Sequence, residues 1–464
     1  MVDKAQSVTG SSPGGGEQTG AGSVLPPVQG PPRPPDGDRS FVETPLNRLA
    51  AYSVLVGIIT GLLVALLNKA ILFTENAVYG TDHLHRLDPA ANIPRGQLAL
   101  TLVVVGFVLS WFWWVLSRYG SAIVSPQAAM GGKKMPLVET IVGAFVAVMA
   151  VAAGAPVGRE NAPRLLGALG AARVCDRMRL DRRTRRILVA SAAGAGLGAS
   201  FHLPLAGALF ALELLLVEMT TRTVVATMLV SATAVGTTGL FIEPHPIYHT
   251  VALTEDFSDL VVAAIVGFVA GIAGHLFGKM ARRAVARHTT GVGLLWQIPA
   301  AFGVVAVVAY FVPGVSGNGR WAADTAFTVG LPVGTLLLIG LFRGGLAILC
   351  FRVGTVGGTL TPAFSLGAVV GSLLGVGLAP LFPDVPAGAF ALLGAAAFLS
   401  TTMAAPMFGM IAAVEFTDMA AQGYLSMFVA VVSAALAVRV YGLLINADQR
   451  HFPLTIAAWT KEEV

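Results

Sequence analysis

The residues best suited to chemistry are the six at Gly158-Arg159-Glu160-Asn161-Ala162-Pro163, which have apolar sequence on both sides. A charged side chain inside a membrane segment costs about 2.5–3.5 kcal/mol or more, so it usually faces a polar pathway. Pro163 is typical of a helix start, where backbone N–H groups lack intrahelical acceptors and can face an anion. A titratable acid beside an anion-attracting helix start is the combination that a gated anion pathway needs. The alternative is a glutamate at a membrane surface, in an ion pair with Arg159.

The elements that must position these residues are membrane-spanning helices. Of the 464 residues, 55% are hydrophobic and 12% are charged, whereas soluble domains are about 25% charged. A span needs about 20 largely apolar residues, and the runs that meet this length are 49–72, 97–116, 260–278, 331–351 and 423–443. Shorter pieces at 122–130, 163–172 and 362–373 predict broken helices whose ends meet inside the protein.

The charge pattern indicates orientation and excludes other functions. Basic clusters at Lys133 and Lys134, at 173–186 and at 279–287 lie between spans, which predicts a cytoplasmic location for them and for the N-terminal tail. These clusters lack interleaved aromatic residues, so a nucleic-acid partner is not expected. The sequence has only two cysteines, so neither a disulfide framework nor a metal centre is expected. No cofactor is expected either.

The chain divides into a tail and a membrane domain. Residues 1–44 are rich in Gly and Pro and are predicted to be a disordered cytoplasmic tail. Residues 45–464 form the predicted transport domain, with halves at about 45–240 and 250–464.

The two halves share a motif in which proline, glycine and glutamate follow at the same spacing. The copies are Pro204, Gly207 and Glu213 in the first half and Pro406, Gly409 and Glu415 in the second. Related halves with broken helices at matching places predict a binding site at their interface near mid-membrane. The recurrence of the two glutamates favours a structural role, in which each bonds backbone groups at the end of a broken helix.

Three segments in the same order resemble the anion-binding signatures of the CLC chloride channel and transporter family. They are Gly120-Ser121-Ala122-Ile123, the motif that contains Glu160, and Gly357-Gly358-Thr359-Leu360-Thr361-Pro362. The family patterns are Gly-Ser-Gly-Ile-Pro, Gly-Arg-Glu-Gly-Pro and Gly-x-Phe-x-Pro, and the resemblance covers almost everything after residue 45. It implies an all-α polytopic membrane protein with two inverted-topology repeats and broken helices, similar to a divergent prokaryotic member without a C-terminal regulatory domain. It also implies a homodimer.

The resemblance implies a role for each matching residue. Glu160 resembles the gating glutamate, which occupies an anion site when ionised and leaves it when protonated. Ser121 resembles the hydroxyl that contacts the central anion. The backbone amides expected to line the pathway are those near Arg159, Asn161 and Ala162 and near Thr359, Leu360 and Thr361.

The chain departs from the family pattern in ways that leave alternatives open. Ser125-Pro126 follows the first signature, so Ser125 is the alternative ligand to Ser121. Leu214 stands where proton-coupled members commonly have a second glutamate, directly after Glu213. The family tyrosine near the C-terminus is absent, and Thr455 is the residue that could donate a hydroxyl in its place.

These observations predict a multi-pass protein of the inner or plasma membrane that moves chloride or a similar anion. Proton-coupled exchange and passive conduction both remain open, and fluoride selectivity and a non-transporting scaffold are further alternatives. An enzyme is not expected, because the sequence has no Ser-x-x-Lys or His-Glu-x-x-His pattern. The expected partners are the anion, protons, the lipid bilayer and a second copy of the chain.

Overall fold

The computed structural model of the chain describes residues 44–79, 94–243, 246–251, 253, 255–312, 314–328 and 330–445. The predicted tail, residues 1–44, lies outside this part except for Thr44, and Thr455 also lies outside it. Helices joined by short loops make up the described residues, and the β-structure among them is a single bridge between Gly158 and Gly358. The expected all-α class is confirmed.

Helices α1 to α8 form the first half of the membrane domain. They are α1 (Leu46–Tyr79), α2 (Arg95–Tyr119), α3 (Pro126–Met130), α4 (Leu137–Ala152), α5 (Asn161–Met178), α6 (Arg182–Phe201), α7 (Pro204–Leu209), which continues as the π-helix η2 (Phe210–Leu216), and α8 (Thr221–Gly239). Helices α9 to α16 form the second half. They are α9 (Phe257–Ala286), α10 (Leu294–Phe311), α11 (Arg320–Thr328), α12 (Val333–Arg352), α13 (Leu360–Leu378), α14 (Ala387–Thr402), α15 (Pro406–Thr417) and α16 (Tyr424–Ile445), with short 3₁₀ turns before α10 and α16.

Seven helices in the described residues are long and apolar enough to span a membrane. They include the five predicted spans, which are α1, α2, α9, α12 and α16, and add α10 and α13. Of the three predicted short pieces, α3 has five residues and α5 is not among the seven spans, but the predicted lengths at 163–172 and 362–373 were wrong. Helix α5 has 18 residues and α13 has 19, because neither the basic residues after Ala172 nor the glycines after Leu373 end the helix.

The two halves use the same set of helix pairs. Helix α1 packs on α8 as α9 packs on α16, and α5 packs on α6 as α13 packs on α14. In the α5–α6 pair and in the α13–α14 pair, the two helix backbones lie in direct contact. A Cβ at Gly167 would lie 2.1 Å from the Ala192 carbonyl oxygen, and one at Gly371 would lie 2.1 Å from the Phe390 carbonyl oxygen. Small residues at these contacts permit close helix packing in a membrane.

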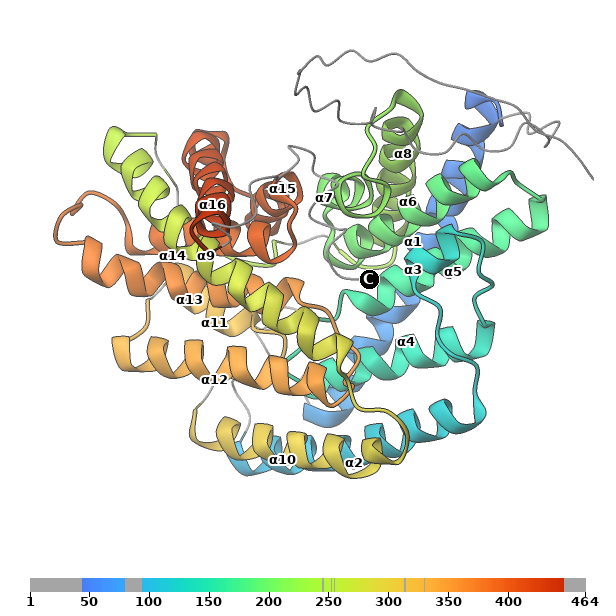
Figure 1. Cartoon of the computed structure of the whole chain (residues 1–464), viewed down its shortest axis with the longest axis horizontal. Coiled ribbons are helices and arrows are strands. Elements are labelled where there is room, and N and C mark those ends of the chain that lie inside the picture. The colour runs from blue at the N-terminus through green and yellow to red at the C-terminus, as the bar shows by residue number, and fades with distance from the viewer. Residues whose placement is uncertain are drawn as a thin grey trace, which may run out of the picture. The chain divides into compact units, whose positions relative to one another are not determined.

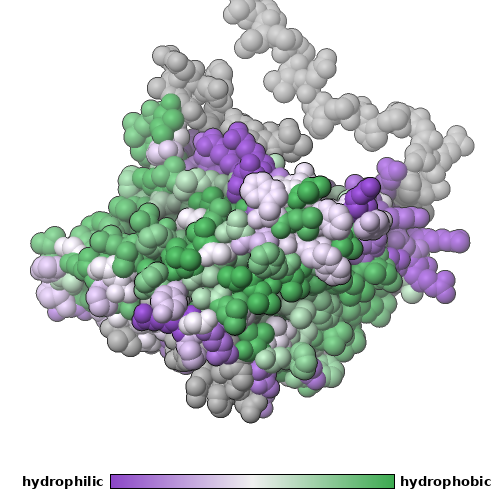
Figure 2. Space-filling view, turned by 90° about the horizontal axis from the view of Figure 1, so that it is seen from below, coloured by the Kyte–Doolittle hydropathy of each residue, from purple (hydrophilic) through white to green (hydrophobic). Residues whose placement is uncertain are grey.

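The halves lie side by side, and α7 and α15 face each other across their boundary (Figure 1). Helices α2 and α10, one from each half, also pack together at the lower edge of that view. Their outward side chains are large and apolar, including Phe107 at 60% exposure and Val307 at 60% exposure. A broad hydrophobic surface on this face is visible in Figure 2, as expected for contact with lipid tails.

Candidate functional site

The two loops that precede α5 and α13 pair directly with each other. The N–H of Gly158 donates to the Gly358 carbonyl and the N–H of Gly358 donates to the Gly158 carbonyl, both at 2.8 Å. This pairing brings the starts of two helices, about 200 residues apart in sequence, to the same place. Helix α5 begins at Asn161 rather than at the predicted Pro163. Pro163 is tolerated inside the first turn, because a backbone N–H there has no intrahelical acceptor.

Glu160 lies where these loops meet. It is 2% exposed, and its carboxylate oxygen Oε1 accepts a hydrogen bond from the backbone N–H of Leu360 at 2.5 Å. Its other oxygen, Oε2, is buried and has no hydrogen-bond donor among the described residues. The carboxylate of the first half therefore occupies the start of α13 in the second half. A surface ion pair with Arg159, the alternative interpretation, does not describe this residue.

Glycine is required on both sides of the Glu160 carboxylate. A Cβ at Gly158 would lie 2.0 Å from Oε2, and one at Gly358 would lie 2.0 Å from Oε1. Real Cβ atoms do not approach other atoms this closely, so larger residues would displace the glutamate. The motif glycines thus permit the close approach of backbone and carboxylate.

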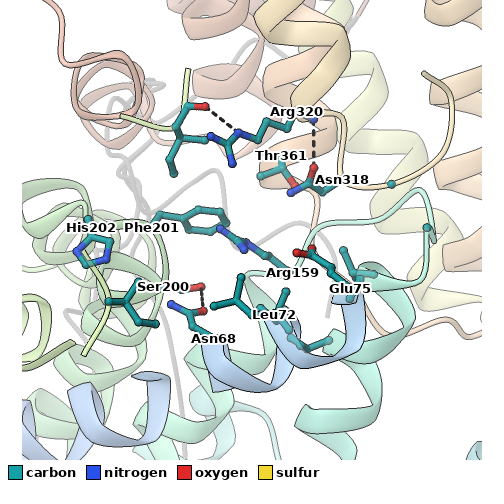
Figure 3. A pocket seen from close by; sticks show the side chains of 18 of the residues that line it. Asn68, Leu72, Glu75, Arg159, Ser200, Phe201, His202, Asn318, Arg320 and Thr361 are labelled. Atoms are coloured by element: carbon teal, nitrogen blue, oxygen red, sulfur yellow. Dashed lines mark hydrogen bonds between the residues drawn. The ribbon is translucent and has the colours of Figure 1, made fainter. Parts of the chain in front are cut away.

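A cavity lined by both polar and apolar side chains lies beside this motif (Figure 3). Arg159 lines it, and its guanidinium carbon lies 4.6 Å from the centroid of the Phe201 ring. Arg320 approaches from α11, donating from Nε to the Ile247 carbonyl at 2.9 Å and from its backbone N–H to Asn318 at 3.1 Å. The cavity volume is about 110 Å³. One water needs about 10–15 Å³ on this measure, so the cavity can hold several waters or a hydrated small ion.

The amides predicted to line the pathway are brought together, with different local roles. Leu360 donates to Glu160. The Thr361 hydroxyl lines the cavity, is buried and has no hydrogen-bond partner among the described residues. Thr359 is the N-cap of α13, and its hydroxyl contacts the Met403 sulfur at 3.5 Å. Arg159 lies directly before Glu160, and Asn161 and Ala162 form the start of α5.

Neither candidate serine lines the cavity beside Glu160, and Ser121 lines a second, separate pocket. Ser121 is exposed, and its backbone N–H donates to the Glu139 carboxylate at 3.0 Å. Ser125 is the N-cap of α3, where its hydroxyl accepts from the Ala128 N–H at 3.3 Å. Ser121 lines a pocket together with Lys133, Lys134, Met135, Pro136, Arg173, Asp176, Ala122 and Val124. Basic side chains therefore surround Ser121, while Ser125 has a structural partner.

The predicted capping role of the repeated glutamates is confirmed. Glu415 accepts from the backbone N–H groups of Leu205 and Ala206, at 2.9 and 2.7 Å, at the start of α7. Glu213 accepts from those of Met407 and Phe408, at 3.3 and 2.8 Å, at the start of α15. Each half thus supplies the carboxylate that satisfies the first turn of the matching helix in the other half.

Several residues at the site have no signal in the sequence. Tyr248, in the loop between α8 and α9, is 1% exposed and lines the cavity. Arg343 is fully buried in α12 and donates to the carbonyls of Gly314, Val315, Ser316 and Gly317 and to the Ser365 hydroxyl. Arg343 thereby orders the glycine-rich loop before α11, which brings Arg320 to the cavity. These contacts join segments that are distant in sequence, so spacing alone could not reveal them.

A family model described as voltage gated chloride channel matches residues 101–439. The chain belongs to this CLC family. Among relatives of this CLC protein, the H(+)/Cl(−) exchange transporter ClcA of Salmonella typhimurium is 29% identical over 412 residues, which is 81% of the chain and 82% of the relative. The ClcA exchangers of Salmonella paratyphi B and Salmonella newport match with the same identity and coverage.

Solved structures share the fold of this CLC protein. A slow cyanobacterial Cl−/H+ antiporter matches with a TM-score of 0.72 and 22% identity, over 85% of this chain and 95% of the other. A CLC-type fluoride/proton antiporter matches with a TM-score of 0.68 and 22% identity, over 86% and 98%. The fold is therefore that of two inverted repeats, and the protein is an integral, multi-pass member of a family of anion transporters.

Proposed function

We propose that this CLC protein exchanges chloride, or a similar small anion, for protons, and that Glu160 is its gate. The observation that carries the proposal is the bond from the Leu360 N–H to the Glu160 carboxylate. The free N–H groups at a helix start are a ready anion site. An ionised Glu160 therefore competes with the transported anion for the same donor, and a protonated Glu160 does not.

The chemistry of the site supports transport rather than tight binding. Backbone amides attract an anion through partial charges, and a conducted ion must also be able to leave its site. Burial of Glu160 between the starts of α5 and α13 supports a place for the acid in the pathway rather than on the surface. The named activities of the relatives, which exchange chloride or fluoride for protons, support the same function.

Passive anion conduction is the second candidate, and a particular feature favours it. Leu214 offers no acid next to Glu213, and both oxygens of Glu213 accept backbone N–H groups. An inner proton route therefore has no uncommitted carboxylate at this place.

Glu160→Gln tests the gating role. In liposomes, wild-type chloride efflux is expected to rise as pH falls, whereas E160Q should transport at a rate independent of pH, because its neutral amide cannot compete as an anion. Glu255→Gln is the matched control, since Glu255 bonds the Leu425 N–H at 3.4 Å on an exposed loop, and it should keep the wild-type profile. A wild-type pH profile in E160Q would refute the gate.

We further propose that the basic pocket around Ser121 and both termini face the cytoplasm, following the excess of Lys and Arg.

We also propose that two chains form a dimer. Exposed apolar side chains on α16, such as Phe428 at 53% and Leu436 at 56% exposure, offer surface for such a contact. The detergent-solubilised protein should then have twice the chain mass of 47.8 kDa. A monomeric mass would contradict the dimer.

A further inference from the structure

Two arginines on α5 and its preceding loop accompany Glu160, and they differ in surroundings. Arg159 lines the cavity and stacks on Phe201. Arg164 is not among the residues that line this cavity, and its guanidinium carbon lies 4.5 Å from the centroid of the Phe210 ring on η2. The gate therefore has one cation on the cavity side and a second one packed against the helix that leads to Glu213.

Arg164 makes no direct polar bond within the described part of the chain. Its Nε is buried without a hydrogen-bond acceptor, and Arg164 is absent from the ion pairs within 4 Å that those residues form. Glu160, the N-cap of α5, lies one helical turn before Arg164 at the i−4 position, where side chains on a helix are neighbours. An arginine in this environment is costly. The Phe210 ring offsets part of this cost through a cation–π contact.

We propose that Arg164 is a positioning residue for the gate: its fixed positive charge favours the ionised form of Glu160 and so sets the pH at which Glu160 leaves the Leu360 N–H. The inference rests on the proposed gating role of Glu160. An uncharged side chain could also pack on the Phe210 ring. The charge of Arg164 therefore has a function beyond packing.

The other charged groups near the gate are on the cavity side or have partners of their own. Glu75, His202, Tyr248 and Arg320 line the cavity with Arg159. On the remaining elements around α5, Lys69 lies 5.6 Å from the Phe241 ring, Arg185 pairs with Asp176, Glu139 bonds Ser121, and Glu213 bonds the start of α15.

The sign of the effect follows from charge alone. Protonating Glu160 beside a fixed cation removes an attraction, so a lower pH is needed to release the gate. Without the charge at residue 164, Glu160 should release at a higher pH. Side chains at i and i+4 have Cβ atoms about 5–6 Å apart, and removal of an opposite charge within about 4–6 Å typically shifts the titration of a carboxylate by about one pH unit or more.

The experiment measures chloride efflux from liposomes against pH for R164M, R164Q and R164K. Both neutral variants should move the half-activation pH upwards by about one unit or more, and R164K should keep the wild-type value. Two neutral variants of different polarity are used in case one does not fold, which size-exclusion chromatography in detergent would reveal. An unchanged midpoint in the folded neutral variants, or an equal shift in R164K, would overturn the proposal.

The double variant E160Q/R164M separates this inference from the proposed function. If Glu160 is the gate and Arg164 acts through it, the double variant should have the flat pH profile of E160Q. If E160Q alone keeps the wild-type pH dependence, the gating proposal fails. If E160Q is flat but R164M leaves the midpoint unchanged, only the role of Arg164 fails.

Discussion

At the scale of single residues, the position of Glu160, the proposed gate, depends on the absence of a side chain at position 358. A Cβ there would lie 2.0 Å from Oε1, 2.2 Å from Cδ and 2.5 Å from Cγ of Glu160. Because the glutamate side chain is flexible and the paired backbone is not, the glutamate is the group that must move. The glycine thus permits Glu160 to reach the Leu360 N–H.

Gly358→Ala should therefore displace Glu160 and open the pathway. We expect chloride flux at pH 7.5 to approach that of E160Q, with a weakened pH dependence, in the same liposome assay. Gly377→Ala is the control, since a Cβ at Gly377, also on α13, has no neighbouring atom within 4 Å. A wild-type pH profile in G358A would show that the carboxylate does not need this space.

A second residue-scale prediction concerns Asp181, in the connection between α5 and α6 outside the spans. It is the N-cap of α6, accepting from the Thr184 N–H at 2.9 Å and from the Thr44 hydroxyl at 2.8 Å. Partial burial, the largest influence, acts to raise the pKa of Asp181, but the hydrogen bonds from Thr184 and Thr44 outweigh it and lower the pKa to about 2. The carboxylate therefore stabilises the fold in full above its unfolded pKa of about 3.9, and this contribution is lost as pH falls through about 2.

Asp181→Ala should lower the free energy of unfolding at pH 7 by about 1 kcal/mol, measured by denaturation in detergent. The difference from wild type should shrink below pH 4. Asp181→Asn should retain most of the stability, because asparagine caps a helix about as well as aspartate. An equal loss in both variants would contradict the capping role.

At the scale of elements, α7 and α15 depend on each other for their first turns. Both helices begin with proline, and both present free N–H groups to a carboxylate from the other half. The segment that bears Glu213 is the π-helix η2, a form that often marks functional places in a helix. This reciprocal exchange fixes the two broken helices at the boundary between the halves.

Glu415→Ala should leave the N–H groups of Leu205 and Ala206 without acceptors and lower the free energy of unfolding by about 1–3 kcal/mol. Glu415→Gln retains one acceptor oxygen and should lose less. Thermal unfolding in detergent measures both. Equal stability of E415A and wild type would mean that water satisfies these donors instead.

At the scale of the whole molecule, the site exists only because both halves contribute to it. The Gly158–Gly358 pair, the Glu160–Leu360 bond and the two glutamate caps all cross between the halves. Transport and coupling are therefore properties of the assembled pair rather than of either repeat.

The reversal potential under opposed chloride and proton gradients measures this coupling. For the proposed exchange, we expect the potential to change with the proton gradient at a fixed chloride gradient, because each transport cycle moves both ions. Glu160→Gln should abolish this response. A wild-type reversal potential equal to the chloride Nernst value at every pH gradient would favour passive conduction, the candidate suggested by Leu214.

The sequence by itself determined the local features. Apolar runs of sufficient length identified five spans, the Pro-Gly-Glu spacing identified the repeat and the capping glutamates, and the motif around Glu160 predicted the residue that we propose as the gate. Each of these is a pattern within a short stretch, where helix geometry and the cost of burying charge act directly on the residues concerned. The ends of α5 and α13 were predicted wrongly. Both helices continue in the structure, α5 past the basic residues after Ala172 and α13 past the glycines after Leu373.

Only the tertiary structure decided which groups meet. It put the Glu160 carboxylate on the Leu360 N–H, the guanidinium of Arg164 on the Phe210 ring, and Tyr248 and Arg320 in the cavity wall. It also separated Ser121 and Ser125, one lining a basic pocket and the other capping α3. These contacts join residues that are far apart along the chain, and their partners are selected by the packing of two whole repeats, which no local spacing encodes.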